Sequence, residues 1–309
     1  MKKLLIINTL QLKMTISKFL NITLAIAFIG VAMAFVTPTV PSRFVGTSSQ
    51  YATDFPSPLS YTPCSEAADA PFQAGEELVY KVYYNLNFVW IPAGEATFKV
   101  EDEGSRYHFS ATGVTYDSYE WFYKAYNKLD SYVDKNTLLP QTSIRWVKEN
   151  RYKLYDKVQY DQKNHTAQYE RGDTKDAVEK RGSIKLTDAM HDLLSAIYYS
   201  RTLDYAHAKE GQDFPMKVML DEETFPLQYR YMGKEEKNIR GLGKYSTMRF
   251  VPQLVAGNVF KENSQMKIWA TDDSNKLPLM IESPVSVGSV KVVLKSYKGL
   301  KYNMDSKKD

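Results

Sequence analysis

Residues 78–86 read LVYKVYYNL, and this stretch decides the fold class. Apolar or aromatic residues occupy every second position from Leu78 to Leu86, while Lys81 and Asn85 stand between them. A period of two places successive side chains on opposite faces of a β-strand. The stretch therefore predicts a strand with one buried face and one face in contact with water.

The same alternation recurs along the chain, for example in LQYRY at 227–231, and short polar turns separate its copies. Three such turns lie between alternating runs: DEGS at 102–105, DQKN at 161–164 and DDSN at 272–275. Runs joined by short polar loops form hairpins, and hairpins build antiparallel sheets, which tolerate one wet face. We predict about a dozen antiparallel strands.

One segment departs from this rhythm. Thr187 can cap a helix, and the residues after it place apolar side chains at helical spacing. These are Met190, Leu193, Leu194, Ile197 and Tyr198. We predict a helix at 187–203 and a second short helix or turn near 119–126. The predicted fold is mainly β: a strongly curved antiparallel sheet, as a half-barrel or barrel, with the 187–203 helix packed against it.

The N-terminus predicts export. A lysine-bearing start precedes an uncharged run at 20–36, which holds the small-x-small triplet AMA at 32–34. This pattern is typical of a secretory leader, so we predict a signal peptide at 1–34, with Met1 or Met14 as its start. The alternative is an uncleaved anchor, although the run is at the short end for a membrane span.

Composition divides the rest of the chain. Residues 35–71 hold six of the 13 prolines and many serines and threonines, which predicts a linker. We expect a single β-rich domain at 72–303 and a polar tail at 304–309. The net charge of +4 equals the four leader lysines, so the remainder is neutral and does not favour nucleic acid as a partner. Cys64 is the only cysteine, which excludes an internal disulfide.

The sequence shows no motif for catalysis, for a cofactor or for a metal. The four histidines lack the spacing of a zinc site. His191, Asp192 and Ser195 invite comparison with a catalytic triad, but on a helix Asp192 points about 100° away from His191. We interpret these three residues as a solvated helix face. We therefore predict no catalytic residues, no cofactor and no metal site.

The densest aromatic cluster supplies the candidate ligand-binding residues, which are Tyr119, Trp121, Phe122 and Tyr123. One interpretation is the mouth of a pocket for an apolar or sugar ligand, because aromatic rings offer stacking and hydrogen bonds. The other interpretation is a plug that fills the core at a sheet edge.

Several segments together carry a resemblance to a known family. They are FQAGEELVY at 72–80, IPAGEA at 91–96, DLLSAIYYSR at 192–201, WATDD at 269–273 with Pro278, and VGSV at 287–290. Over residues 72–303 the chain resembles domain of unknown function family 3108 (DUF3108). The resemblance implies an exported envelope protein of diderm bacteria and transfers no catalytic residue. At the level of fold, it is also similar to lipoprotein-carrier and lipid-binding half-barrels.

Three functions are open on this basis. The first is a non-catalytic periplasmic binding or carrier protein for a lipid or other apolar ligand, which predicts an apolar pocket. The second is a structural or protein-interaction module of the cell envelope, which predicts a filled core and an exposed apolar patch. The third is a polysaccharide-active enzyme, which needs two facing carboxylates. The expected partners are an apolar ligand or envelope proteins, and an uncleaved leader is the only expected link to a membrane.

Overall fold

The computed structural model of this chain describes residues 70–86, 89–121, 123–254, 266–285 and 288–308. The predicted signal peptide and almost all of the predicted linker lie outside these residues. The described part holds one helix, α2 (Leu193–Ser200), which is too short to cross a bilayer. Its strands are β1 (Glu77–Leu86), β2 (Val89–Glu103), β3 (Arg106–Thr115), β4 (Ala125–Asp134), β5 (Pro140–Glu149), β6 (Tyr152–Asp161), β7 (Thr166–Thr174), β8 (Ala177–Lys185), β9 (Asp213–Leu220), β10 (Glu223–Ile239), β11 (Gly243–Leu254), β12 (Lys267–Thr271), β13 (Pro278–Pro284), β14 (Ser289–Lys298) and β15 (Lys307–Lys308).

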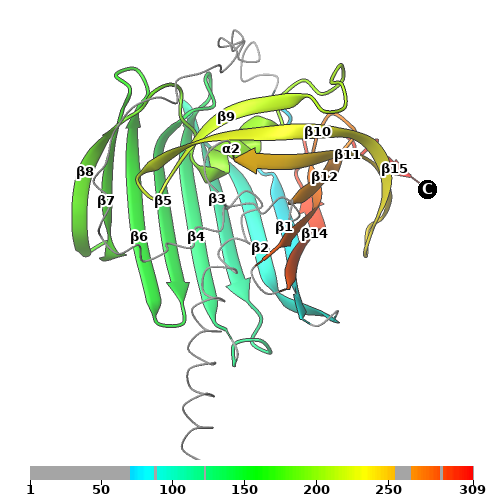
Figure 1. The fold of residues 1–309 in the computed structure, drawn as a ribbon, viewed down its shortest axis with the longest axis horizontal. Helices are drawn as coiled ribbons and strands as arrows, with labels where there is room; N and C mark the ends of the chain where they lie inside the picture. Colours follow the sequence, from blue (N-terminus) through cyan, green and yellow to red (C-terminus); the bar gives the residue numbers. More distant parts are fainter. Residues whose placement is uncertain (1–69, 87–88, 122, 255–265, 286–287, 309) are drawn as a thin grey trace, which may run out of the picture.

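The strands form one antiparallel sheet, and most neighbours in the sheet are also neighbours in the chain (Figure 1). The order is β8-β7-β6-β5-β4-β3-β2-β1-β14-β13-β12-β11-β10-β9, with β15 paired to β11. The three polar turns noted in the sequence lie in the β2–β3, β6–β7 and β12–β13 hairpins. The predicted mainly-β fold is confirmed. Because β8 and β9 are both edge strands, the sheet is not closed into a barrel.

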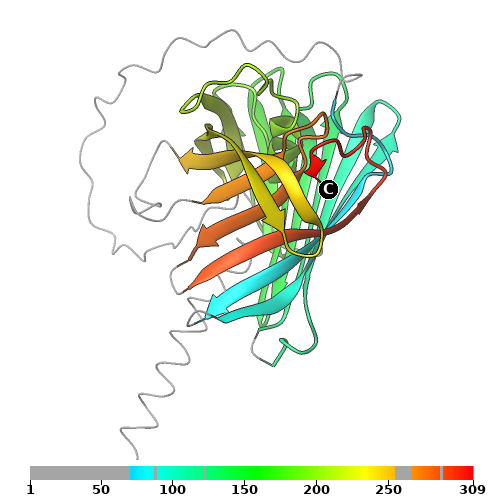
Figure 2. The same ribbon diagram turned by 90° about the vertical axis from the view of Figure 1, so that its right-hand side faces the viewer.

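Irregular pairings bend this sheet. The β10–β11 register shifts between Tyr231 and Lys234, and both ladders of β1 contain a shift as well. A bulge increases the local twist of a strand and bends it. At the β10 shift, Gly233 has a φ of +85°, a conformation that a side chain would oppose. As a result, the orange strands of the C-terminal half cross the green N-terminal strands steeply, and the two halves face each other (Figure 2).

The alternation in β1 places the core on the concave face of the sheet. Leu78, Tyr80, Val82 and Tyr84 are all buried, as their spacing predicts. Strand register continues this inner face into β14, where Val292 lies opposite Val82. The apolar core therefore fills the space between the two facing halves.

Helix α2 is shorter than the predicted 187–203, and its cap is Asp192 instead of Thr187. The Asp192 carboxylate accepts hydrogen bonds from the backbone N–H groups of Leu194 and Ser195 at 2.8 and 3.1 Å. The preceding residue, His191, is extended because its backbone pairs with β9 through Lys217 and Met219. This long-range pairing delays the start of the helix, which then packs on the concave face against β3, β4 and β9.

Ion pairs hold the two edges of the sheet together where no backbone ladder does. The β9–β10 turn carries Asp221 and Glu222, and both carboxylates pair with basic side chains of strands β5 to β8 at the other end of the strand order. Asp221 pairs with Arg145 of β5 and with Arg171 of β7, the latter at 3.0 Å, and Glu222 pairs with Lys180 of β8. Burial alone would raise the pKa of Asp221, but the two arginines outweigh burial and lower it. The sheet stays open, and ion pairs instead of backbone hydrogen bonds link the β9–β10 turn to strands β5, β7 and β8.

Both ends of the described chain take part in the fold. Pro71, at the end of the predicted linker, is buried and accepts a hydrogen bond from Arg201 at 3.0 Å. Where the sequence predicts a polar tail at 304–309, Lys307–Lys308 form β15. Ser306 is buried, and its hydroxyl donates to Asp273 at 2.7 Å.

Candidate ligand cavity

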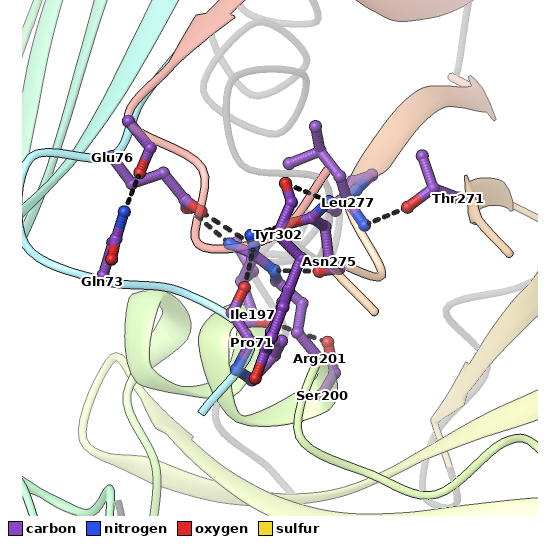
Figure 3. Close-up of polar contacts among 12 residues, drawn as sticks. Pro71, Gln73, Glu76, Ile197, Ser200, Arg201, Thr271, Asn275, Leu277 and Tyr302 are labelled. Atoms are coloured by element: carbon purple, nitrogen blue, oxygen red, sulfur yellow. Dashed lines mark hydrogen bonds and ion pairs between the residues drawn. The ribbon is translucent and has the colours of Figure 1, made fainter. Parts of the chain in front are cut away.

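A buried ion pair holds the C-terminal end of α2 (Figure 3). Arg201 caps the helix, and its guanidinium donates to both carboxylate oxygens of Glu76 at 2.6 and 2.9 Å. It also donates to the carbonyl oxygens of Pro71 and Asn275 at 3.0 and 3.1 Å. Burial alone would lower the pKa of Arg201, but Glu76 outweighs burial and raises it, so the guanidinium stays protonated.

Asn275 ties the C-terminal segment to the same place. Its side-chain amide donates to the carbonyl oxygens of Tyr302 and Asn303 at 3.1 and 2.9 Å. Its backbone carbonyl accepts from Arg201 (Figure 3). The start of the domain, the end of α2, the β12–β13 turn and the C-terminal segment therefore converge on one buried node. This node holds α2 against the concave face, where the helix forms one wall of a cavity.

The cavity lies between α2 and strands β1, β2 and β10–β14 of the sheet. Its volume is about 70 Å³. Most of its lining is apolar or aromatic, and the lining residues are Leu78, Tyr80, Phe98, Ile197, Tyr198, Ser200, Arg201, Tyr205, Tyr229, Phe250, Ile268, Ala270, Lys276, Pro278, Ile281 and Val292. One water molecule needs roughly 10–15 Å³ on this measure, so the space holds about five water-sized groups.

Four tyrosines line the cavity, and their hydroxyls differ. The Tyr80 hydroxyl donates to the carbonyl oxygen of Pro278 at 2.9 Å, and the Tyr205 hydroxyl donates to that of Ser200 at 2.7 Å. The buried hydroxyls of Tyr198 and Tyr229 have no hydrogen-bond partner among the described residues. A buried polar group without a partner costs roughly 1–3 kcal/mol, so these two phenols need a particular explanation.

Burial also determines the protonation state of these two phenols. It raises the pKa of Tyr229 and raises that of Tyr198 well above its usual value. Both therefore keep their protons in the physiological range and can act as hydrogen-bond donors. A ligand oxygen that entered the cavity would be an acceptor for them.

The three predicted ligand-binding residues that the structure describes, Tyr119, Trp121 and Tyr123, do not line this cavity. Tyr119 and Tyr123 are buried at the end of the sheet where β3 and β5 finish, and the Tyr123 hydroxyl donates to Glu149 at 2.5 Å. Trp121 is 85% exposed, in contrast to the two buried tyrosines. Phe122 lies outside the described residues. Ligand binding by this cluster stays a prediction. Of the short helix or turn predicted near 119–126, the described residues form a turn followed by β4.

The group at His191, Asp192 and Ser195 is buried, so its interpretation as a solvated helix face is wrong. The His191 Nδ1 atom lies 3.3 Å from the Ser195 hydroxyl, but Ser195 is fully enclosed. The Asp192 carboxylate instead caps α2 and accepts from Ser131 at 2.5 Å. Burial lowers the pKa of His191 to about 3. These contacts describe a helix cap and not a catalytic triad.

No set of three histidine, cysteine, aspartate or glutamate side chains in the described ranges is arranged to hold a metal ion. The buried carboxylates already have protein partners. Glu76 accepts from Arg201, and Glu149 accepts from Tyr123 and Asn127. Burial raises the pKa of Glu149, against the effect of those two donors.

Sequence periodicity placed Tyr198 and Tyr229 in the core, but it could not show that their hydroxyls lack partners. Helical spacing assigns Tyr198 to an apolar stripe, and strand alternation places Tyr229 beside Leu227 and Tyr231 on one face. Both assignments are correct about burial. The available signal was that a tyrosine at an inward position brings a hydroxyl that needs a partner. Nothing local connects Glu76 to Arg201, which are 125 residues apart.

The family of the chain follows from a match over most of this fold. Residues 79–295 match the model described as "Protein of unknown function (DUF3108)". The chain belongs to the DUF3108 family. No curated protein matches it.

Solved structures show what the DUF3108 fold is similar to. A β-barrel-like protein of domain of unknown function DUF1849 from Brucella abortus has a TM-score of 0.51 and 7% identity, with 76% of this chain and 100% of that chain covered. A Bacteroides fragilis protein described as exported, with a YmcC-like fold, has a TM-score of 0.31 and 9% identity over 74% and 97% of the chains. A Parabacteroides distasonis protein described as a lipoprotein has a TM-score of 0.29 and 10% identity over 76% and 99%. The first likeness shows a shared β-barrel-like fold.

Two of the DUF3108-like sequence segments meet at the buried node, and a third ends just before it. Segment 72–80 supplies Glu76, segment 192–201 supplies Arg201, and Asn275 follows closely after segment 269–273. The same segments also supply the cavity-lining residues Leu78, Tyr80, Ile197, Tyr198 and Ala270. The parts of the sequence that resemble the family therefore build both the node and the cavity wall.

Proposed function

We propose that this DUF3108 domain is a non-catalytic binding or carrier protein for a lipid or similar amphiphile. The observation that supports this is an apolar cavity whose lining includes Tyr198 and Tyr229, two tyrosines whose buried hydroxyls have no hydrogen-bond partner in the described structure. A ligand oxygen that accepted their hydrogen bonds would remove a cost of roughly 1–3 kcal/mol for each hydroxyl.

The lining defines the chemistry of the proposed ligand. Phe250, Ile268 and Val292 provide apolar contacts for a hydrocarbon chain. Tyr198 and Tyr229 select a hydrogen-bond acceptor such as a carboxylate, an ester carbonyl or a hydroxyl oxygen. The cavity of about 70 Å³ encloses only a part of a lipid, so the rest of the ligand extends beyond it.

The proposed place of action is the periplasm or cell envelope. The leader predicted at 1–34 supports export, because a charged start, an apolar run and a small-x-small triplet are what signal peptidase substrates share. The proline-rich segment at 35–71 would act as a spacer between the domain and the leader.

The test is ligand binding by the purified chain. Native mass spectrometry of protein from its own envelope should detect a co-purifying lipid, and titration with the fluorescent fatty acid cis-parinaric acid should saturate. Ala270→Leu fills the cavity and should weaken probe binding about tenfold without lowering the melting temperature. Thr112→Leu is the matched control, because Thr112 lies between two buried inner-face residues of β3 and faces the other side.

Two results would count against the proposal. One is a wild-type chain that carries no lipid and does not bind the probe. The other is equal probe binding by wild type and Ala270→Leu. A lipid-free chain that co-purified with an envelope protein would instead favour a structural or interaction module.

A further inference from the structure

Large apolar side chains are exposed mainly at one end of the sheet. Among the described residues, those at least 36% exposed are Val89, Val114, Trp121, Tyr126, Tyr152 and Tyr302. All except Tyr302 belong to the β1–β2, β3–β4 and β5–β6 connections or to the strand ends beside them. Antiparallel pairing brings these three connections to the same end of the sheet, which is the lower end in Figure 1.

Strand register makes several of these residues direct neighbours. Val114 lies opposite Tyr126, Tyr126 lies opposite Lys148, and Lys148 lies opposite Lys153. Residues that face each other across a ladder have Cβ atoms about 5 Å apart. Tyr152 is next to Lys153 in the chain. Val114, Tyr126, Lys148 and Lys153 therefore form one row across this end of the sheet.

This surface carries a positive charge. Lys148, Arg151 and Lys153 are exposed, and none of them forms an ion pair within the described part of the chain. Lys124 is also exposed but pairs with Glu120 at 2.6 Å. We call Val89, Val114, Trp121, Tyr126, Lys148, Arg151, Tyr152 and Lys153 the aromatic-basic rim.

Acidic residues do not neutralise the rim. Asp117 is exposed beside it, whereas Glu149 is 1% exposed and accepts hydrogen bonds inside the sheet. The next connection at this end, between β7 and β8, carries the exposed residues Asp173 and Asp176. The unpaired positive charge of the rim is therefore concentrated at the β5–β6 connection, beside the exposed apolar residues of β2, β3 and β4.

We propose that the aromatic-basic rim docks the domain on the surface of a bilayer that contains anionic lipids. Tryptophan and tyrosine prefer the interfacial layer of a membrane, and lysine and arginine are attracted to anionic headgroups. The rim residues lie at turns and strand ends, so they can enter the headgroup layer together while the body of the sheet stays outside. Its unpaired positive charge is complementary to anionic lipid and not to a neutral surface.

Vesicle co-sedimentation of the purified chain tests this, with its N-terminus determined by mass spectrometry so that every variant is compared with the same leader state. The chain should bind vesicles that contain phosphatidylglycerol, and this binding should fall as NaCl is raised. Binding to vesicles of phosphatidylcholine alone should be several-fold weaker. Trp121→Ser and the Lys148→Glu, Lys153→Glu double variant should each lower the bound fraction several-fold.

The controls keep the same chemistry at other places. Tyr302→Ser removes an exposed aromatic ring outside the rim, and Lys163→Glu reverses a charge in the β6–β7 turn at the opposite end. Both controls should bind like wild type. Equal binding to both vesicle types, or no loss in the rim variants, would overturn the proposal. The proposal would also be overturned if the wild type did not bind vesicles and the rim variants lost a protein that co-purifies with the wild type. These outcomes do not depend on the cavity.

Discussion

Changing Tyr229 to phenylalanine removes one buried oxygen atom from the cavity and leaves the aromatic ring in place. In the wild type, Tyr229 is 4% exposed as a whole residue. Its hydroxyl is buried and has no hydrogen-bond partner in the described structure. In the absence of ligand, Tyr229→Phe should therefore stabilise the domain, because an unsatisfied buried hydroxyl costs roughly 1–3 kcal/mol. For a domain of this size, about 1 kcal/mol corresponds to a rise of roughly 2–4 °C in melting temperature.

The same change should weaken binding of an oxygen-bearing ligand. The net contribution of one hydrogen bond is about 0.5–1.5 kcal/mol, which corresponds to roughly a 2- to 12-fold higher Kd. Differential scanning calorimetry of the delipidated chain gives the first quantity, and titration with cis-parinaric acid gives the second. A variant that becomes more stable and binds less well has the signature expected of a binding residue.

Tyr80→Phe is the matched control, because it removes a cavity-lining hydroxyl that already donates to Pro278 at 2.9 Å. It should lower the melting temperature and leave the Kd nearly unchanged. If Tyr229→Phe also lowered the melting temperature, its hydroxyl would have a partner in the protein, and our explanation of the cavity would be refuted. Unchanged probe affinity in Tyr229→Phe would separately exclude this hydroxyl as a ligand contact.

The remaining predictions concern stability. Arg201→Met leaves the Glu76 carboxylate buried without its partner and should lower the free energy of unfolding, measured in urea, by about 3–5 kcal/mol. Adding Glu76→Gln should recover part of this loss. A loss below about 1 kcal/mol would contradict the buried node. On the convex face, hydrogen bonds from His108 to Asp130 at 2.8 Å and to Glu101 at 3.0 Å raise the pKa of His108, against burial. Its stabilisation is complete below the unfolded pKa of about 6.5 and is lost as pH rises through the raised folded pKa. The melting temperature of wild type should therefore exceed that of His108→Gln by a margin that shrinks as the pH rises above about 6.5, and a constant difference would disprove the linkage.

Local patterns explain why much of the fold was predictable. Alternation in 78–86 depends only on one face of a strand being buried, and the polar turn at 102–105 closes a hairpin between adjacent segments. Both features are encoded within a few residues, and both are present in the structure. The existence of α2 was predictable for the same reason. Its start was not, because His191 pairs with β9, a strand more than 20 residues further along the chain.

The sequence alone determined that this chain is mainly antiparallel β, that one helix packs on the sheet, and that Tyr198 and Tyr229 face inward. These properties follow from periodicity, which is local. Only the tertiary structure decided that Glu76 meets Arg201 across 125 residues, that the sheet stays open with its edges held by charges, and that two inward hydroxyls lack partners. The physical reason is that a hydrogen bond or ion pair depends on which distant residues are close in space, and periodicity is a local property that does not contain this information.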